Sequence, residues 1–278
     1  MTSAKTVRKL KSGSSYLLKA ILGIAFISPL IIGLAFSFQT EEALVTYPLH
    51  LFTDNPTLAS YAEVFRKVPL LLYLKNSVIV CFFSILGQVI FASLAAYAFV
   101  YFDFRFKKAL WTLVLMTMMV PGEVVVITNY VTIQHWGLIN TFLGLIITHL
   151  ISGTAIFMMR QYYLTLPKDF KEAATIDGCS DMGFLFRIAT PLSIPTISAL
   201  AIYLFVSIYN AFFWPLLVTN KDTMRTVQIG ISFLVTSDII SYGQILAGAV
   251  VAIVPSVIAY IFGQDYIIKG MTAGGVKG

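Results

Sequence analysis

The sequence predicts an all-α polytopic membrane protein with six transmembrane helices. Of its 278 residues, 58% are hydrophobic and only 12% are charged, and the mean hydropathy is +0.85. Soluble globular domains carry roughly 25% charged residues. The hydrophobic residues gather in six segments, each near the roughly 20 residues that a helix needs to cross a bilayer. Because only helices and closed barrels satisfy the backbone in lipid, these segments predict helices.

The six predicted spans follow one another with no soluble domain and no repeat of fixed period. They are Leu17–Phe38, Ser77–Tyr101, Ala109–Ile133, Thr141–Met159, Pro191–Val218 and Gly243–Phe262. The first is not a cleavable signal peptide, because it is long and no small-residue cleavage site precedes Glu41 and Glu42. We therefore divide the chain into an amino-terminal arm (1–16), a transmembrane domain (17–262) and a carboxyl-terminal tail (263–278).

Basic residues are unevenly divided between the two sides of this arrangement. The amino-terminal arm, the second inner loop, the 160–190 loop and the tail hold 14 of the 19 Lys and Arg residues. Because the side richer in Lys and Arg faces the cytoplasm, both termini and the 160–190 loop are expected there. The net charge of +6 arises in these loops. It therefore indicates a lipid bilayer as the partner and not a nucleic acid.

The polar segment Lys168–Pro191 stands between the fourth and fifth spans. A bundle that only crossed a bilayer could use a short turn here, so an ordered loop of this length indicates a docking surface. Asp169 is predicted to cap a first helix, with Glu172 as its reciprocal partner. Gly178 is predicted to end that helix in a left-handed turn.

The rest of this loop predicts a second short helix, capped by Ser180 and ending at Thr190 and Pro191. Within the first helix, Ala173 and Ala174 favour helix and offer a thin face that another protein can approach closely. The alternative interpretation is an ordinary amphipathic helix at the membrane interface.

Several stretches of the sequence resemble one family of membrane proteins. Glu172-Ala173-Ala174 and Asp177-Gly178, followed by Phe186, Ile188, Pro191 and Pro195, resemble the EAA loop of ABC importer permeases. The stretches 118–123, 210–215 and 270–278 are similar to the maltose-type permease subunit of carbohydrate importers. The resemblance runs from about Leu17 to the last residue. Cys179 stands where the family usually has Ala, and Thr190 where it usually has Leu.

The resemblance implies the type I ABC importer permease fold and a mechanism. The helix at Glu172–Asp177 would be a coupling helix, seated in a cytoplasmic ATPase subunit and moved when ATP closes the ATPase dimer. The implied coupling residues are Glu172, Ala173, Ala174, Asp177, Gly178, Phe186 and Pro191. The implied partners are a second homologous permease subunit, a dimer of ATPase subunits, an extracytoplasmic solute-binding protein and a sugar. The implied location is a bacterial or archaeal cell membrane.

The chain itself has no Gly-x-x-x-x-Gly-Lys-Ser/Thr phosphate loop. We therefore expect ATP and Mg²⁺ on a separate ATPase chain, and we expect this chain to be a transport subunit without a cofactor and not an enzyme. The family also carries glycerol phosphate and other polyols, so these remain alternatives to a sugar. The tail Thr272–Gly278 resembles an extension that reaches the ATPase in some members, and a frayed terminus is the other interpretation.

Polar and aromatic residues on the third and fifth spans are the candidates for the substrate path, because polar groups in lipid are unfavourable and usually functional. They are Glu123, Asn129, Tyr130, Tyr209, Asn210 and Trp214. Pro121 and Gly122 are expected to break the third span locally. The alternative is that Glu123 and Asn210 bind neighbouring helices or the partner permease, and for Glu123 this role is favoured. His149 and Gln88 are interpreted as structural.

Two other classes of function make predictions that the sequence does not meet. A secondary transporter or channel predicts inverted repeats and a chain of intramembrane charges. An intramembrane enzyme needs a catalytic pair or a metal cluster, and no His-Glu or Cys-His constellation is present in the sequence. Cys81 and Cys179 lie far apart in the chain and are expected to be unpaired, with no metal-binding spacing around them.

Overall fold

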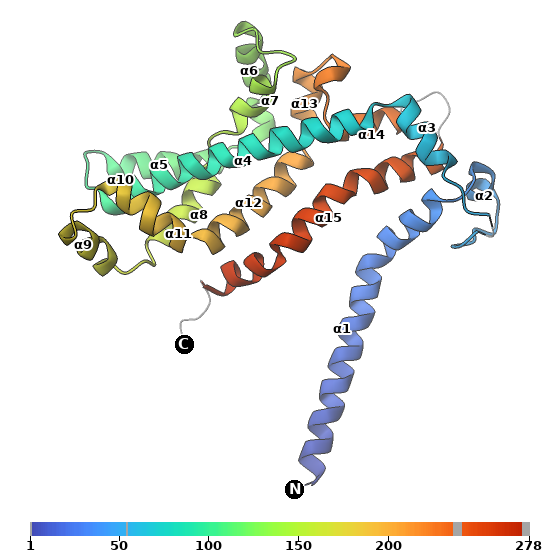
Figure 1. Ribbon diagram of the computed structural model, residues 1–278, viewed down its shortest axis with the longest axis horizontal. Helices are drawn as coiled ribbons and strands as arrows, with labels where there is room; N and C mark the ends of the chain where they lie inside the picture. The colour runs from blue at the N-terminus through green and yellow to red at the C-terminus, as the bar shows by residue number, and fades with distance from the viewer. Residues whose placement is uncertain (1, 54, 236–240, 274–278) are drawn as a thin grey trace. The chain divides into compact units, whose positions relative to one another are not determined.

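The computed structural model describes residues 2–53, 55–235 and 241–273, and every regular element within these ranges is a helix (Figure 1). This confirms the predicted all-α class. The chain forms two compact units, one of Met1–Val68 with Ile231–Val251 and the other of Pro69–Gly230 with Ala252–Gly278.

Three helical segments are each long and apolar enough to cross a membrane: Leu18–Ser37 in α1 (Thr2–Ser37), α4 (Leu70–Tyr101), and Tyr242–Asp265 in α15 (Tyr242–Ala273). Three bent pairs of helices pass the same test. The total of up to six is consistent with the predicted number of spans. Helix α15 continues to Ala273, past the predicted start of the tail, and residues 274–278 lie outside the described residues.

The bent pairs show more interruptions than the one that was predicted, at Pro121 and Gly122 in the third span. Helices α5 (Lys107–Thr117) and α6 (Gly122–His135) meet at 98°. The pair α7 (Phe142–Ile146) with η1 (Ile147–His149) meets α8 (Gly153–Tyr163) at 48°. The segment Asp181–Leu192 meets α12 (Ile194–Tyr209) at 75°, and α13 (Phe213–Val218) follows after a further break.

Each of these breaks has a local cause. Pro121 lies in extended conformation before α6 and has no N–H to continue α5, which confirms the predicted break. Ser152 caps α8 by accepting a hydrogen bond from the N–H of Ala155 at 3.4 Å. Asn210 ends α12, and its side-chain amide donates to the carbonyl of Val206 at 2.9 Å. Neither Ser152 nor Asn210 was predicted to interrupt a span.

The first unit contains α1, α2 (Glu41–Val45), α3 (Ala59–Lys67) and the start of α15. Glu41 holds the beginning of α15: its carboxylate accepts from the N–H of Tyr242 at 2.7 Å and of Gly243 at 3.2 Å, and from the Ser241 hydroxyl at 2.7 Å. A carboxylate here complements the positive end of the helix dipole. Lys67 adds a hydrogen bond to Gln244 at 2.8 Å.

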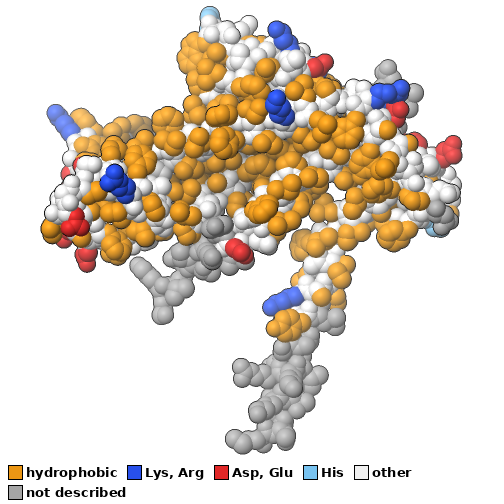
Figure 2. Space-filling model, viewed as in Figure 1, with side chains coloured by type: hydrophobic (Ala, Val, Ile, Leu, Met, Phe, Trp, Pro, Cys, Tyr) orange, Lys and Arg blue, Asp and Glu red, His pale blue; other side chains and the backbone are white. Residues whose placement is uncertain are grey.

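The second unit is built around α4, which packs against α8 and α12. Ala92, Ser93 and Ala96 are buried on α4, and a Cβ atom on Gly87 would meet the Leu150 side chain at 2.4 Å. These small residues let the helices approach closely. Apolar side chains cover most of the face that Figure 2 shows, as expected for helices that contact lipid.

Candidate functional site

The 168–191 loop forms two short helical segments joined by a tight turn. The first is α9 (Asp169–Ile176), and Gly178 after it has φ +76°. The N–H of Cys179 donates to the carbonyl of Ala174 at 2.8 Å, and the N–H of Gly178 to that of Thr175 at 3.1 Å. These two bonds form a Schellman motif, which confirms the predicted left-handed turn. A Cβ on Gly178 would have open space, so the constraint is its backbone conformation alone.

The two predicted helix caps differ in outcome. Ser180 accepts a hydrogen bond from the N–H of Gly183 at 3.1 Å and caps α10 (Asp181–Phe184), as predicted. Asp169 does not cap α9. It is the first helical residue, and Lys168 occupies the cap position without a side-chain hydrogen bond. Asp169 and Glu172 therefore stabilise the first turn through the helix dipole and not as a capping box.

After α10 the chain continues through a π-helical turn, η2 (Leu185–Ala189), into α11 (Thr190–Leu192). The N–H of Thr190 donates to the carbonyl of Leu185, five residues earlier. Pro191, the next residue, has no N–H to donate. The second segment therefore runs to Leu192, slightly beyond its predicted end.

Helix α9 is fastened to the carboxyl-terminal end of α4 by one polar cluster. Lys171 pairs with Asp181, and the Tyr97 hydroxyl of α4 donates to the same carboxylate at 3.2 Å. The Lys171 ammonium also lies 5.0 Å from the Phe184 ring centre. Partial burial lowers the pKa of Lys171, but the hydrogen bonds to Asp181 and Tyr97 outweigh it and leave the pKa above its usual value.

Much of the surface of α9 is open. Ile176 is 86% exposed and Phe170 45%, and Glu172 and Ala173 are also in exposed positions. Ala174 is only 5% exposed, so it packs inward and does not contribute to the thin docking face that the sequence predicted. The remaining predicted coupling residues, Asp177, Gly178, Phe186 and Pro191, are all exposed.

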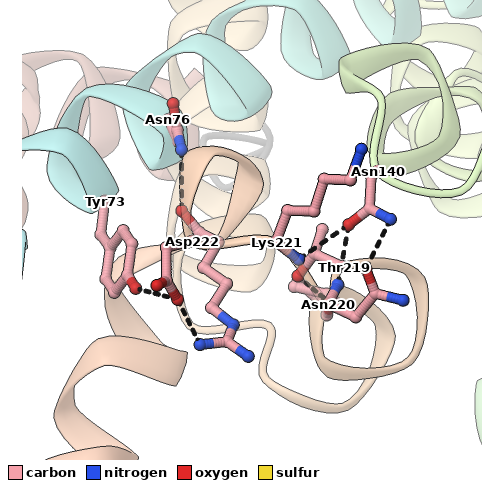
Figure 3. Close-up of polar contacts among 9 residues, drawn as sticks. Tyr73, Asn76, Asn140, Thr219, Asn220, Lys221 and Asp222 are labelled. Atoms are coloured by element: carbon pink, nitrogen blue, oxygen red, sulfur yellow. Dashed lines mark hydrogen bonds and ion pairs between the residues drawn. The ribbon is translucent and has the colours of Figure 1, made fainter.

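A second polar cluster holds the amino-terminal end of α4 (Figure 3). The Asn76 amide donates to the backbone carbonyls of Thr223 and Arg225 at 3.0 and 2.9 Å. Tyr73 donates to Asp222 at 3.1 Å. Asn140 accepts from the N–H groups of Asn220 and Lys221 at 2.8 and 3.0 Å. These bonds fix the segment that contains η3 (Asp222–Met224), which follows α13.

The two clusters are separated by the thickness of a membrane. Asn76 and Tyr97 are 21 positions apart on one continuous helix, which at 1.5 Å per residue is about 32 Å. The hydrocarbon core of a bilayer is about 30 Å thick. The 168–191 loop and the 219–225 segment therefore lie at opposite ends of a membrane-spanning length.

Between these ends, the three interrupted spans line two adjoining cavities of about 460 and 420 Å³. Thr148, His149, Gly122 and Val125 contribute to both. The larger cavity is also lined by residues at the breaks before α6 and before α8, and by the last turns of α12. The smaller is lined by Ala211 and the start of α13. Irregular backbone at membrane depth is tolerated where it lines a cavity or is buried in protein, which these breaks satisfy.

The cavities contain some of the predicted path residues but not all of them. Glu123, Asn129 and Trp214 line the smaller cavity. Tyr130 is half-buried and is not among the residues that line either cavity. Asn210 lies beside this lining, where it accepts a hydrogen bond from Gln228 at 3.2 Å. Tyr209 was placed in the wrong role: it is 2% exposed and donates to the carbonyl of Ala252 at 2.7 Å, so it joins α12 to α15.

Three lining residues were missed or interpreted only as structural. Gln88 of α4 and Thr148 line the larger cavity, and His149 stands beside Thr148. The Gln88 Oε1 and Thr148 Oγ1 atoms are buried without a hydrogen-bond partner, as is Trp214 Nε1. The only signal for Gln88 in the sequence was that a polar residue lies within an apolar span. That signal does not show which side of α4 faces the cavity.

Apolar spans, broken helices around two cavities, and a projecting helix at one end are together typical of the transmembrane subunit of a transporter. The chain belongs to the family of binding-protein-dependent transport system inner membrane components, whose model matches residues 59–272. This membership establishes a membrane transport component.

Two groups of relatives carry names of different solutes. The arabinooligosaccharides transport system permease protein AraQ of Halalkalibacterium halodurans is 35% identical over 92% of this chain and 95% of its own length. The sn-glycerol-3-phosphate transport system permease protein UgpE of Agrobacterium fabrum is 33% identical over 91% and 94%. Both names describe transport permeases.

A solved structure shows the same fold. One chain of a bacterial ABC transporter involved in the import of the acidic polysaccharide alginate matches with a TM-score of 0.80, over 93% of this chain and 96% of that one. The sequences are 20% identical, so the likeness concerns the fold alone. It agrees with the predicted permease architecture.

Proposed function

We propose that this chain is the permease subunit of an ATP-driven, binding-protein-dependent sugar importer. It forms half of the translocation path, beside a second homologous permease subunit. The observation that carries the proposal is the projecting helix α9, which is anchored through Lys171 to Asp181 and α4 and exposes the side chains of Ile176 and Phe170. A helix that is held in place and exposes large apolar side chains suits docking to another protein.

The docking partner is proposed to be a cytoplasmic ATPase subunit, one of a dimer that binds ATP and Mg²⁺. The chain has no phosphate loop of its own. The surplus of Lys and Arg supports placing the 168–191 loop and both termini in the cytoplasm. The 219–225 segment, a membrane length away, then belongs to the surface that receives an extracytoplasmic solute-binding protein.

A sugar is the proposed substrate because the arabinooligosaccharide relatives match over nearly their whole length. The glycerol-phosphate relatives support sn-glycerol 3-phosphate as a second candidate. Uptake measured with the purified complex of permeases, ATPase and binding protein in proteoliposomes decides between them. Uptake of arabinotriose or maltotriose supports the sugar, and uptake of sn-glycerol 3-phosphate alone contradicts it.

Gly178→Asp tests the coupling role of the loop. An aspartate at φ +76° is strained by roughly 1 kcal/mol, and it places a second carboxylate next to Asp177 at the docking face. We expect the variant to insert in the membrane normally and to lose ATP-dependent uptake. Normal uptake in cells without a duplicate transporter would contradict the proposal.

Gly137→Asp is the matched control. Gly137 has φ +69°, and a Cβ on it also has open space, but it lies in the turn after α6. The same backbone strain is therefore introduced away from α9. We expect this variant to keep its coupling between ATP hydrolysis and uptake, and an equal loss in both variants would show that strain and not docking causes the defect.

A further inference from the structure

We propose that the headgroup of an anionic phospholipid binds where the start of α5 meets the end of α8, with Arg160 as the central cation of the site. The inference goes beyond the transport function, because it concerns how the chain is held in its bilayer and does not depend on the solute. All of the residues involved belong to the second unit.

The Arg160 side chain is held by aromatic rings. Its guanidinium lies over the Trp111 ring, 4.1 Å from the ring centre. Trp111 of α5 in turn stacks with Phe157 of α8, with ring centres 6.2 Å apart and planes 16° from parallel. An arginine stacked on an aromatic face keeps the N–H groups in its own plane available for hydrogen bonds. The stacking therefore orients Arg160 without using up its donors.

Arg160 has no anion to balance its charge. Within the residues that the structure describes, it forms no ion pair with a carboxylate. Its Nε is buried without a hydrogen bond, whereas the two terminal nitrogens are not enclosed in this way. A guanidinium stays charged and binds a phosphate group through two parallel hydrogen bonds. The terminal nitrogens are therefore the atoms that we expect a phosphate to contact.

Further cations stand at the start of α5. Arg105 and Lys108 are exposed, and neither takes part in an ion pair within residues 2–53, 55–235 and 241–273. Asp103 is paired with Lys107 at 3.3 Å, so it does not balance the other two. Together with Arg160 these residues form a basic cluster next to the membrane, which attracts anionic lipids.

The depth of Arg160 and Trp111 matches that of a lipid headgroup. Trp111 lies four residues after the start of α5, and Arg160 lies three residues before the end of α8. At 1.5 Å per residue, both are about 5–6 Å inside the helix ends. Tryptophan is enriched at this boundary between headgroups and acyl chains. The end of α4 is near the same depth, because the rings of Phe99 and Trp111 are 5.4 Å apart.

An apolar surface on α5 continues from the basic cluster into the span. Leu110, Leu113 and Met116 recur every three residues and are 45%, 55% and 54% exposed. Residues at this spacing lie on one side of a helix. A phospholipid combines an anionic head with apolar chains and so fits the cluster and this surface together. A water-soluble ATPase subunit would account for the cations but not for the apolar side chains that follow them into the span.

The test is photo-cross-linking in the assembled complex of this chain with its partner subunits, in nanodiscs of dioleoyl phosphatidylcholine. Phosphatidylglycerol and phosphatidylcholine that carry the same diazirine in one acyl chain are added separately as minor components. Labelled peptides of this chain are mapped by mass spectrometry. We expect the phosphatidylglycerol probe to label residues 110–116 at least about tenfold more strongly, and unlabelled phosphatidylglycerol to compete with it.

Two variants remove single cations from the cluster. Arg160→Gln is expected to lower labelling by the phosphatidylglycerol probe about fivefold and to leave labelling by the phosphatidylcholine probe unchanged. Lys108→Gln, at an exposed position, is expected to lower it by a similar factor. If Arg160→Gln fails to assemble, Lys108→Gln decides the result, because its side chain is not packed in the fold.

Arg187→Gln is the matched control. Arg187 is an exposed arginine of the 168–191 loop, which follows α8 on the same side of the chain, and it lies outside the basic cluster. The same charge is removed, so a general attraction of the loops for anionic lipid would be lowered equally. We expect labelling of residues 110–116 to stay the same.

Three results would overturn the lipid site. They are equal labelling by the two probes, labelling that Arg160→Gln and Lys108→Gln lower no more than Arg187→Gln does, and no labelling of α5 by either probe. The last result would show that a protein partner covers this face. Uptake is not part of the measurement, so a failure of the proposed transport function remains distinguishable from a failure of this site.

Discussion

The two ends of α4 are held by similar groups arranged in different ways. At each end a tyrosine hydroxyl of α4 donates to an aspartate that is paired with a cation. The sets are Tyr73, Asp222 and Arg225 at one end and Tyr97, Asp181 and Lys171 at the other. At the first end the ion pair is local, between residues three apart. At the second it joins α9 to α10, two separate elements.

This difference shows where each end gets its rigidity. The Tyr73 end depends on Asn76, which is 2% exposed and binds two backbone carbonyls. The Tyr97 end depends on a charge pair whose side chains are 21% and 50% exposed. Hydrogen bonds from a buried side-chain amide are less open to competition from water than an ion pair between partly exposed side chains. We therefore expect the Tyr73 end to be rigid, and the Tyr97 end to hold α9 in a position that a binding partner can change.

The largest expected effect is that of Asn76→Leu. The substitution removes the donor of two part-buried hydrogen bonds, to the carbonyls of Thr223 and Arg225, and each lost bond costs about 0.5–1.5 kcal/mol. We expect a fall of several degrees in the Tm of the purified complex and faster proteolysis within 219–225. Lys75→Ala, at the exposed neighbouring position, is the control. An unchanged Tm would contradict the expected rigidity of the Tyr73 end.

Lys171→Met is expected to have a smaller and more local effect. It removes the ion pair with Asp181 and the contacts of the ammonium with the Tyr97 and Phe184 rings. Each of the two ring contacts is worth about 0.5–1 kcal/mol. Amide hydrogen exchange in α9 should become roughly tenfold faster while exchange in α4 stays the same. Lys168→Met, at an exposed position before the helix, should change neither. Faster exchange throughout α4 would show that the two ends are not independent.

The smallest effects are expected from removing one hydroxyl at each end. Tyr73→Phe and Tyr97→Phe each delete one hydrogen bond to a carboxylate, of 3.1 and 3.2 Å, worth about 0.5–1.5 kcal/mol. Similar shifts in Tm for the two variants would confirm that the tyrosines are equivalent. A clear difference between the two Tm shifts would show that the tyrosines, and not Asn76 and Lys171, cause the difference in rigidity between the two ends.

Hydropathy predicted six spans, a number with which the structure is consistent if each bent pair is one span, because apolar length is a property of the sequence alone. The interruptions were harder to predict. The break at Pro121 could be predicted because proline has no N–H to continue a helix. Serine and asparagine also occur inside helices, and Ser152 and Asn210 mark breaks here because their side chains form hydrogen bonds with nearby backbone. The loop motif predicted Gly178 and Ser180 correctly because both act locally.

Which side of a helix a residue faces is set by tertiary packing, and this is where the site prediction fell short. Tyr209 and Ala174 turn into the fold, and Gln88 faces a cavity although it was assigned to helix packing. An apolar span has little difference between its faces, so its sequence does not show which side meets water. Only the contacts with α8, α12 and α15 decide it.

The bonds of Glu41 to the start of α15 bear on the order in which this protein assembles. They join residues about 200 positions apart, and the first unit combines the opening residues of the chain with 231–251. Synthesis proceeds from the amino terminus, so the first span enters the membrane long before its partner exists. We expect chains truncated after residue 230 to retain the α4, α8 and α12 contacts, but to leave Glu41 and α2 without that partner and open to degradation.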